Sequence, residues 1–188
     1  MDALELLLTR TSSPLLQEPA PTADQLELMM KAASRAPDHG SLTPYRFLKV
    51  EGEGLRALGE LFLTAGRASA GELSEAQATK LRNMPLRAPM ILVAVAVTQE
   101  HPKVPVSEQV ITAGCAAHAV VQAACAQGVG AMWRSGDMAF NPKVAQGLGL
   151  AENEQIIGFI YLGQTVKEKT VPEADTARLI TDWPILQG

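Results

Sequence analysis

The stretch Pro89-Met-Ile-Leu-Val-Ala-Val-Ala-Val97 is apolar at every position. A continuous run of this kind predicts a central strand that is covered on both faces. A second apolar stretch, residues 110–133, has no formally charged residue and is long enough to suggest a membrane helix. Small and polar residues dominate it, however, Leu and Phe are absent, and Gly128 and Gly130 end the helix before Trp133. It is therefore predicted to be a buried core helix.

The remaining segments contain helices and strands in an order that decides the fold class. Helices are predicted over residues 2–10, 22–35, 74–83 and 142–147. A further helix is predicted from about residue 55 and is followed by a polar, mobile-looking stretch at 68–74. Strands are predicted over residues 45–50, 131–133 and 155–162. This order does not follow a simple βαβ rhythm. We expect an α+β fold, with a mixed central sheet flanked by helices, and not a doubly wound sheet. Because no repeat or linker interrupts them, residues 1–188 are predicted to form a single domain.

Two features leave the oligomeric state open at this point. The small residues of the central helix would let another helix approach closely, so this helix lies either at the centre of a large interface or in the core of a monomer. The C-terminal tail, residues 164–188, carries apolar residues such as Leu179, Ile180 and Trp183 without periodicity. Such a tail needs a surface to lie on, which belongs either to its own chain or to a partner.

Composition excludes several classes of protein. The chain is 47% hydrophobic and 19% charged, which is ample for a core and excludes a disordered chain. Its net charge is −4 and no basic run is present, so no nucleic-acid partner is expected. The first residues carry acids and no basic segment, so no signal peptide is expected and the cytoplasm is the predicted location.

The two cysteines are predicted to be free thiols in a reducing compartment. Cys115 and Cys125 lie ten residues apart on one predicted helix, so they would be about 15 Å apart, too far for a disulfide. Cys115 and His118 share a helical face, but no further ligand pattern accompanies them. No metal site is therefore predicted.

Two short segments place an arginine at the exit of a helix, and both suggest an anionic ligand. They are Arg10-Thr11-Ser12-Ser13 and Arg35-Ala36-Pro37-Asp38-His39. Guanidinium groups present a planar fork of donors that fits phosphate, and hydroxyls and turn N–H groups add further donors. The alternative is two solvated arginines, which the helix dipole favours at a C-terminus.

A set of motifs in a fixed order resembles those of a known family. The motifs are Arg10-x-Ser12, Arg35-Ala-Pro-Asp-His39, Pro44-Tyr-Arg-Phe47, Arg87-Ala-Pro89, Ala126-Gln-Gly128, Trp133-Arg-Ser-Gly136 and Gly158-Phe-Ile-Tyr-Leu-Gly163. Each is weak alone, but their order and spacing over nearly the whole chain are specific. The chain resembles the FMN-dependent nitroreductases, and within them a branch of short-chain NAD(P)H nitroreductases.

The resemblance implies an intertwined homodimer with two FMN sites at the subunit interface, embraced by the C-terminal tails. It implies that Arg10, Thr11 and Ser12 of one subunit hold the FMN phosphate and ribityl chain. It further implies that Arg35 and His39 reach the same flavin from the other subunit. Other residues implied at the site are Trp133, Arg134 and Ser135 along the flavin, and Ala123, Ala124, Cys125, Ala126, Gln127 and Gly128 at the nicotinamide donor.

The resemblance also implies departures from the family pattern. Many relatives have a second arginine where Thr11 stands, which predicts weaker phosphate affinity here. Ser41 and Thr43 replace Asn and Gln of the family, and Tyr45 stands where Trp is common. The contacts at the flavin edge and the substrate preference are therefore open. The short segment 65–74 predicts a pocket without a large lid.

The implied chemistry requires no protein nucleophile or acid–base pair, because the flavin ring carries the hydride. The sequence indeed has no such dyad and no dinucleotide fingerprint, so no catalytic side chain is predicted. A cation such as Lys103 or Arg134 would stabilise the reduced ring. The predicted activity is ping-pong reduction of nitroaromatic, quinone or related small-molecule acceptors by NAD(P)H. Whether the donor is NADH or NADPH, and which acceptor is physiological, stays open.

Two other classes of function fit the same residues. One is a quinone reductase, a flavin reductase or a flavin-processing enzyme of the same fold. The other is a non-catalytic dimeric protein that binds a different anionic ligand in the interface cleft.

Overall fold

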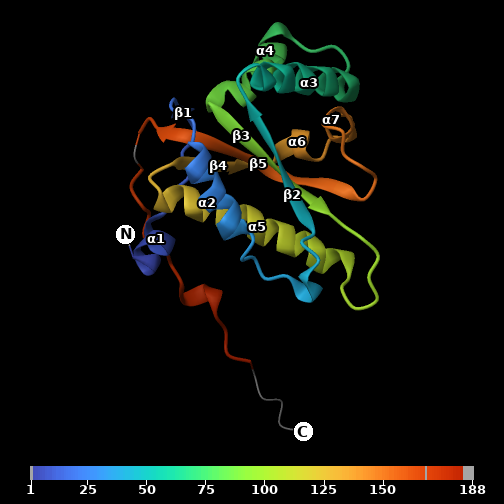
Figure 1. Cartoon of the computed structure of the whole chain (residues 1–188). Helices are drawn as coiled ribbons and strands as arrows, with labels where there is room; N and C mark the ends of the chain where they lie inside the picture. Colours follow the sequence, from blue (N-terminus) through green and yellow to red (C-terminus); the bar gives the residue numbers. More distant parts are fainter. Residues whose placement is uncertain (1, 168, 184–188) are drawn as a thin grey trace.

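A computed structural model describes residues 2–167 and 169–183, and a five-stranded sheet lies at its centre (Figure 1). The strands are β1 (Leu16–Gln17), β2 (Tyr45–Glu51), β3 (Met90–Val97), β4 (Gly130–Arg134) and β5 (Glu154–Thr165). Strand β5 pairs with β1, β3 and β4, and β3 also pairs with β2. The stretch predicted to be a central strand is therefore central.

Every strand pairing among the described residues is antiparallel, so the mixed sheet that the sequence predicted is not seen within one chain. A continuous apolar run is typical of parallel strands because helices usually cover both of their faces. Here helices cover both faces of an antiparallel sheet, and nearly all of β3 is buried. The continuous apolar run of β3 therefore reflects the burial of both faces of the sheet and not the direction of its strands.

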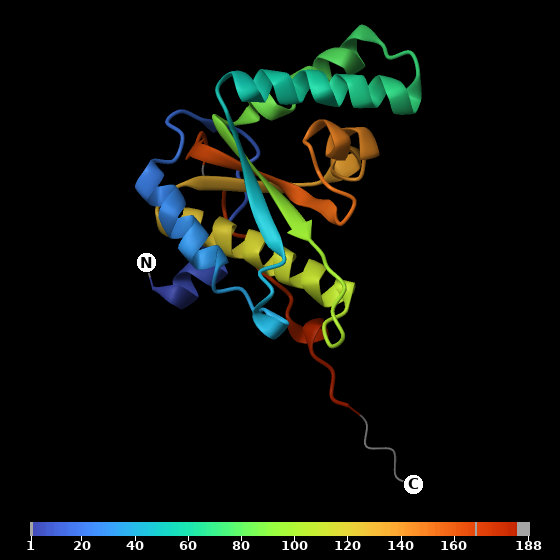
Figure 2. The same ribbon diagram turned by 45° about the vertical axis from the view of Figure 1, so that its right-hand side comes forward.

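The helices lie in two layers on opposite faces of the sheet, as Figures 1 and 2 show. Helices α2 (Ala23–Ala33) and α5 (Val106–Ala126) cover one face, and α1 (Ala3–Thr9) lies beside α5. The other face is covered by α3 (Glu53–Ala70), α4 (Glu75–Asn83), α6 (Gly136–Ala139) and α7 (Pro142–Gly147). The layers confirm the α+β class.

Helix α5 is long and apolar enough to cross a membrane by length and composition alone. Eight of its residues are buried in this fold, where they pack on α2 and on the sheet. It is thus the buried core helix that the sequence predicts. The helix begins at Val106, four residues before the uncharged stretch starts.

Local signals set several helix boundaries. Thr22 and Gln25 form a reciprocal capping box at the start of α2, and Ser74 with Gln77 forms another at α4, as predicted. Asn141 accepts a hydrogen bond from the N–H of Lys143 and caps α7. Each cap satisfies backbone donors that have no partner within the helix.

Four local features differ from the sequence prediction. Helix α3 continues through Ala70, so residues 68–70 are helical and only 71–73 form the turn before α4. The short elements β1 and α6 were not predicted, because two and four residues carry no periodicity. Gln164 and Thr165 pair with β1 inside β5, so the tail starts at residue 166 and not at 164.

The described part of the tail runs away from the body of the molecule and contains one short 3-10 turn, η3 (Ala177–Leu179) (Figures 1 and 2). Its apolar side chains are largely exposed: Leu179 by 76%, Ile180 by 81% and Trp183 by 86%. The tail therefore does not use its own chain as the surface that its apolar residues need. Residues 184–188 of the predicted tail lie outside the described residues.

Candidate functional site

A polar hollow of about 400 Å³ lies between the exit of α1, the end of α5 and the end of β5. It is lined by Thr9, Arg10, Thr11, Ser13, Val121, Cys125, Gly128, Val129, Gly130, Ala131, Gln164, Thr165 and Lys169. The hollow thus brings part of the first predicted arginine segment to the C-terminal turn of α5. These two parts of the sequence are more than a hundred residues apart.

The wall beside Arg10 is fixed by hydrogen bonds to the sheet. The N–H of Ser13 donates to the carbonyl oxygen of Ala131 on β4 at 3.0 Å, and the Ser13 hydroxyl lies 3.1 Å from that of Thr165 on β5. Within the segment, Nη1 of Arg10 donates to the Ser12 hydroxyl at 3.3 Å. The chain leaves α1 at Arg10 with extended backbone, so the segment lies along the sheet edge. Arg10, Thr11 and Ser13 line the hollow, whereas Ser12 is not among its lining residues.

A second cation, Lys169, reaches this hollow from the tail. Sequence reasoning missed it, because an isolated lysine in an aperiodic tail gives no signal of its partners. Thr165 was missed because it lies beyond the predicted strand 155–162, at the end of β5 that pairs with β1. Arg10 and Lys169 together with the Thr11 and Ser13 hydroxyls form a donor set suited to a phosphate group.

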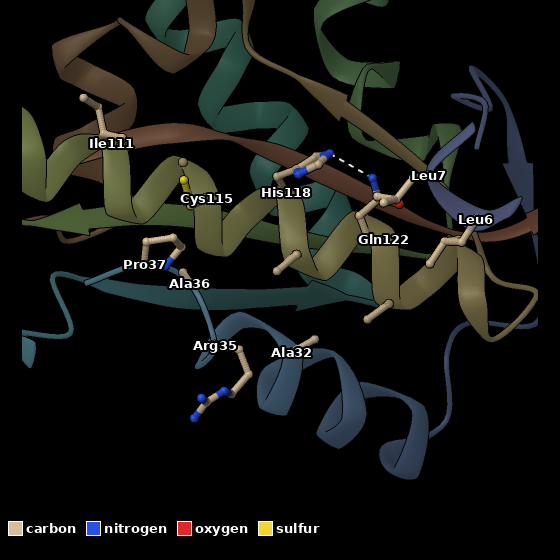
Figure 3. Close-up of a pocket in the computed structure, with 13 residues that line it drawn as sticks. Leu6, Leu7, Ala32, Arg35, Ala36, Pro37, Ile111, Cys115, His118 and Gln122 are labelled. Atoms are coloured by element: carbon tan, nitrogen blue, oxygen red, sulfur yellow. Dashed lines mark hydrogen bonds between the residues drawn. The ribbon is translucent and has the colours of Figure 1, made fainter. Parts of the chain in front are cut away.

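A separate, mostly apolar hollow of about 780 Å³ lies over the outer face of α5 (Figure 3). Its lining comes from three helices and the turn after α2, and consists of Leu6, Leu7, Ala32, Arg35, Ala36, Pro37, Ile111, Gly114, Cys115, His118, Ala119, Gln122 and Ala123. Arg35 is exposed, and its side chain extends away from α5. The two predicted arginines therefore line different hollows of one chain.

The α5 face of this hollow carries polar side chains whose hydrogen bonds are not all made within the described chain. Nε2 of His118 lies 3.0 Å from Nε2 of Gln122 one turn later, as the dashed line in Figure 3 marks. The Oε1 atom of Gln122 is buried and has no hydrogen-bond partner among the described residues. A buried amide oxygen without a partner is costly. This face therefore offers a hydrogen-bond acceptor to a molecule that contacts it.

His39 lies in the loop that follows Arg35, in the 3-10 turn η1 (His39–Ser41). Its Nδ1 atom lies 2.7 Å from the carboxylate of Glu108 in the first turn of α5, and both side chains are about half exposed. The Asp38 carboxylate accepts hydrogen bonds from the N–H groups of Leu42 and Thr43 and fixes the loop. His39 is thus held on the same side as Arg35 and not beside Arg10.

Tyr45 joins this loop to α2, because its hydroxyl donates to the carbonyl oxygen of Ala33 at 3.1 Å. Burial raises the pKa of the Tyr45 phenol, and the negative charge of Asp38 raises it further. The hydroxyl therefore stays a donor across the physiological range. This bond holds the end of α2, from which Arg35 projects.

The segment Trp133-Arg134-Ser135 does not present its side chains to one surface. Trp133 packs with the cluster formed by α2, α5 and the sheet, where a Cβ at Gly158 would collide with its indole. Arg134, the next residue of the strand, stacks on Tyr161 in the opposite layer. Alternation along a strand explains this separation, and Ser135 beyond it is exposed.

The segment predicted for the nicotinamide donor ends α5. Ala123 lines the apolar hollow, while Cys125 and Gly128 line the polar one. Ala124 is fully buried, so its side chain is not accessible to a ligand. Gln127 donates to the carbonyl oxygens of Gln25 and Ala123 and fastens α5 to α2; Ala126 is exposed. A nicotinamide site here stays a prediction.

No group of three or more potential metal ligands is found among the described residues. Lys103 lies in the loop before α5, where its N–H and that of Val104 donate to Nδ1 of His101. It is not among the residues that line either hollow.

Comparison with known proteins gives this geometry a context. The model of the nitroreductase family matches residues 9–164. The Escherichia coli K12 protein named "Putative NAD(P)H nitroreductase YdjA" is 47% identical over 163 residues, which cover 87% of this chain and 88% of that protein.

Solved structures share the fold. A nitroreductase-like family protein from Bacillus cereus superimposes with a TM-score of 0.81 at 21% identity, over 97% of this chain and 96% of that one. An FMN-dependent nitroreductase from Clostridium difficile R20291 gives a TM-score of 0.70 at 17% identity, over 95% and 98% of the two chains.

Proposed function

Because the chain belongs to the nitroreductase family, we propose that it is an FMN-dependent oxidoreductase that draws electrons from NAD(P)H and passes them to small-molecule acceptors. Nitroaromatic compounds and quinones are the acceptor classes. The observation that carries the proposal is the polar hollow beside Arg10. Its lining residues lie in the region 9–164 that the family model matches, except Thr165 and Lys169, which follow it.

The residues of the hollow fit the phosphate end of FMN. Arg10 and Lys169 supply two positive charges, and Thr11 and Ser13 supply hydroxyl donors. Gly128, with φ of +73°, lets the backbone turn back at the end of α5 without a side chain in the way. A volume of about 400 Å³ is within the ordinary range for small-ligand pockets.

The proposed enzyme is a homodimer whose second copy completes the site. Exposed apolar side chains gather on α1 and α5, and the tail adds more; they are Leu4, Leu7, Leu8, Ile111, Leu179 and Ile180. Large apolar side chains left exposed in this number on one chain indicate a contact with another protein surface. In the proposed dimer, Arg35 and His39 of one subunit face the flavin whose phosphate is held by Arg10 of the other.

When bound, FMN supplies the ring that accepts a hydride and gives it to the acceptor. The protein's own task is to bind and orient. In the proposed site Arg10 and Lys169 hold the phosphate, and the partner's surface excludes water. Donor and acceptor occupy the same space in turn, which gives ping-pong kinetics.

The experiment that tests the proposal is an absorbance spectrum of the pure protein before and after anaerobic addition of NADH or NADPH. We expect a flavin spectrum that bleaches with at least one donor. Acceptor assays with a nitroaromatic compound, a quinone and free flavin then separate nitroreductase activity from quinone or flavin reduction. A colourless protein that takes up no added FMN would overturn the proposal and favour a non-catalytic binding protein.

A further inference from the structure

A further hollow, of about 720 Å³, lies between two pairs of helices on the sheet face opposite α5. Figures 1 and 2 show α3 and α4 on one side of this region and α6 and α7 on the other. None of its lining residues lines the Arg10 hollow or the hollow over α5. Its volume is within the ordinary range for small-ligand pockets. The fold therefore contains a space of ligand size that the phosphate assignment does not use.

Contacts between the helices hold the walls of this hollow in place. Gly66 of α3 lets α4 approach closely, since a Cβ at this position would lie only 2.5 Å from Cδ1 of Leu81. On the other side, Nδ2 of Asn141 donates to the Ser69 hydroxyl at 3.0 Å and fastens the start of α7 to α3. Asn141 is only 9% exposed. All four residues line the hollow, so its shape is formed within one chain before a ligand binds.

Apolar and aromatic side chains form much of the lining. Met84 and Met138 contribute thioethers, which make favourable contacts with aromatic rings. Phe140, at the C-terminal end of α6, lines the same hollow and is 78% exposed. An exposed phenyl ring beside a hollow suits a planar ligand, because ring pairs are stabilising beyond the area that they bury. The lining therefore favours a ligand with a flat apolar ring.

Two charged side chains of opposite sign line the hollow, Lys80 of α4 and Asp137 of α6. Both are exposed, and in the described part of the chain neither forms an ion pair with another residue. The ammonium group can donate to an oxygen of a ligand, whereas the carboxylate disfavours a ligand with negative charge. Together they favour a molecule that is polarised but uncharged.

The hollow lies at the end of the segment that the resemblance assigns to the flavin. Gly130 lines the Arg10 hollow and Gly136 lines this one. Strand β4 and the assigned residues 133–135 connect the two glycines. The chain that is predicted to follow the flavin thus leads from the phosphate-binding hollow to this second one.

We propose that this hollow holds the electron acceptor and selects an uncharged aromatic molecule with a nitro or quinone oxygen. Lys80 donates to that oxygen, Phe140 contacts the ring, and Asp137 disfavours acceptors that carry a carboxylate. In the overall reaction a nitro group takes the hydride of NAD(P)H and one proton from solvent, and leaves as a nitroso group and water. This inference rests on the proposed function, to which it adds the place and the selectivity of the acceptor.

The test compares two acceptors of similar size, para-nitrobenzyl alcohol and para-nitrobenzoate, of which only the second is charged. Equilibrium dialysis against the full-length oxidised protein measures their binding without turnover. Wild-type protein should bind the alcohol about threefold more tightly, because Asp137 repels the carboxylate of the benzoate. The steady-state KM values of the two acceptors should follow the same order.

Substitutions at exposed positions assign the binding to the hollow. Phe140→Ala should weaken the binding of both acceptors about tenfold, because it removes the ring contact. Lys80→Met should weaken both about threefold, whereas the matched control Lys143→Met, an exposed position on α7 outside the lining, should change neither. Asp137→Asn should strengthen the binding of para-nitrobenzoate alone, about threefold.

Two results would overturn the inference. One is binding of both acceptors at wild-type strength by Phe140→Ala and Lys80→Met. The other is an unchanged affinity for para-nitrobenzoate in Asp137→Asn. Bleaching of the flavin by NAD(P)H is measured separately in each variant and should match wild type. Normal bleaching together with either of the two results refutes the acceptor site alone, whereas a colourless protein that takes up no FMN refutes the proposed enzyme.

Discussion

The two arginine segments look alike in sequence but differ in their surroundings. Arg10 leaves α1 beside small polar residues and enters a hollow that already contains Lys169 and two hydroxyls. Arg35 leaves α2 beside similar residues, yet its exposed side chain extends away from the long helix of its own chain (Figure 3). The Arg10 segment thus has charged and polar neighbours within its own chain, whereas the Arg35 segment does not.

The two hollows differ in the same way. The one at Arg10 is lined by hydroxyls and backbone at the sheet edge, whereas the larger one at Arg35 is lined mostly by Leu, Ala, Pro and other apolar groups. Polar donors suit an ionic ligand, and an apolar face suits another protein surface. We infer that half of the flavin site is built within a chain and that the other half requires a second copy.

The largest effect is expected from removing the tail. A chain that ends at Thr165 should lose the dimer, because the exposed apolar residues of the tail have no surface on their own chain. It should also lose flavin, because Lys169 and the partner's Arg35 go with it. Sedimentation velocity and flavin absorbance measure both effects.

A second variant separates the two roles of the tail. Leu179→Ser with Ile180→Ser keeps Lys169 but removes two apolar contacts, so it should weaken the dimer and lower flavin content only as far as the dimer dissociates. A truncated chain that stays fully dimeric would contradict the embracing tail.

Substitution of the first arginine should have the next largest effect. Arg10→Ala should weaken FMN binding at least tenfold, or about 1.4 kcal/mol, because it removes a charge-assisted contact to phosphate. Titration of the apoprotein with FMN, followed by flavin fluorescence, measures the change. Arg67→Ala on the exposed side of α3 is the matched control and should bind as wild type does. Equal affinity in both variants would reject the phosphate assignment.

A smaller effect is expected at the second cation of the same hollow. Lys169→Ala should weaken FMN binding about threefold, because an exposed ammonium contributes less than a fixed guanidinium. Its effect should shrink as salt concentration rises. A loss as large as that of Arg10→Ala would mean that the lysine is the main phosphate contact.

An ion pair at the far end of β5 should affect stability and leave flavin binding unchanged. Nε of Arg46 donates to Glu154 at 2.5 Å and Nη2 donates at 2.8 Å, and the Glu154 side chain is only 9% exposed. These hydrogen bonds hold the pKa of Glu154 at about 2, well below its ordinary value. Glu154 lies ten residues, or about 33 Å of strand, from Gln164 at the polar hollow.

The sign of the pH dependence follows from that lowered pKa. The ionised carboxylate stabilises the fold fully above the unfolded pKa of 4.5, and this contribution disappears as pH falls from 4.5 to about 2. Arg46→Gln should lower the free energy of unfolding by about 1 to 2 kcal/mol at pH 7, since the partly exposed arginine is screened by solvent. Urea unfolding at pH 7 and pH 3 checks this, and a difference from wild type that is equally large at both pH values would contradict it.

Sequence patterns predicted the elements that have strong local signals. The run at 89–97 became β3, the capping pairs at Thr22 and Ser74 began helices, and Asn141 capped α7. Each of these depends on neighbours within a few residues. Strand direction, the two-residue β1 and the four-residue α6 depend on distant partners, so the local sequence did not determine them.

The site was predictable to a lesser degree for the same reason. Arg10 and Thr11 could be found from their own segment, but Lys169 enters the hollow only through the path of the tail. Trp133 and Arg134 are neighbours in sequence, yet strand alternation sends them to different layers. The separation arises because residues 131–134 lie in a strand with a buried layer on each side, which the two residues alone do not reveal.

The most direct measurement of the shared site is complementation between two defective chains. Arg10→Ala and Arg35→Ala should each bind little FMN alone. When they are co-expressed, random pairing should give mixed dimers in which about one site in four has both arginines intact. We therefore predict that flavin content and NAD(P)H-dependent activity return to roughly a quarter of wild type in the mixture. Flavin content no higher than that of the single variants would contradict a site built from two chains.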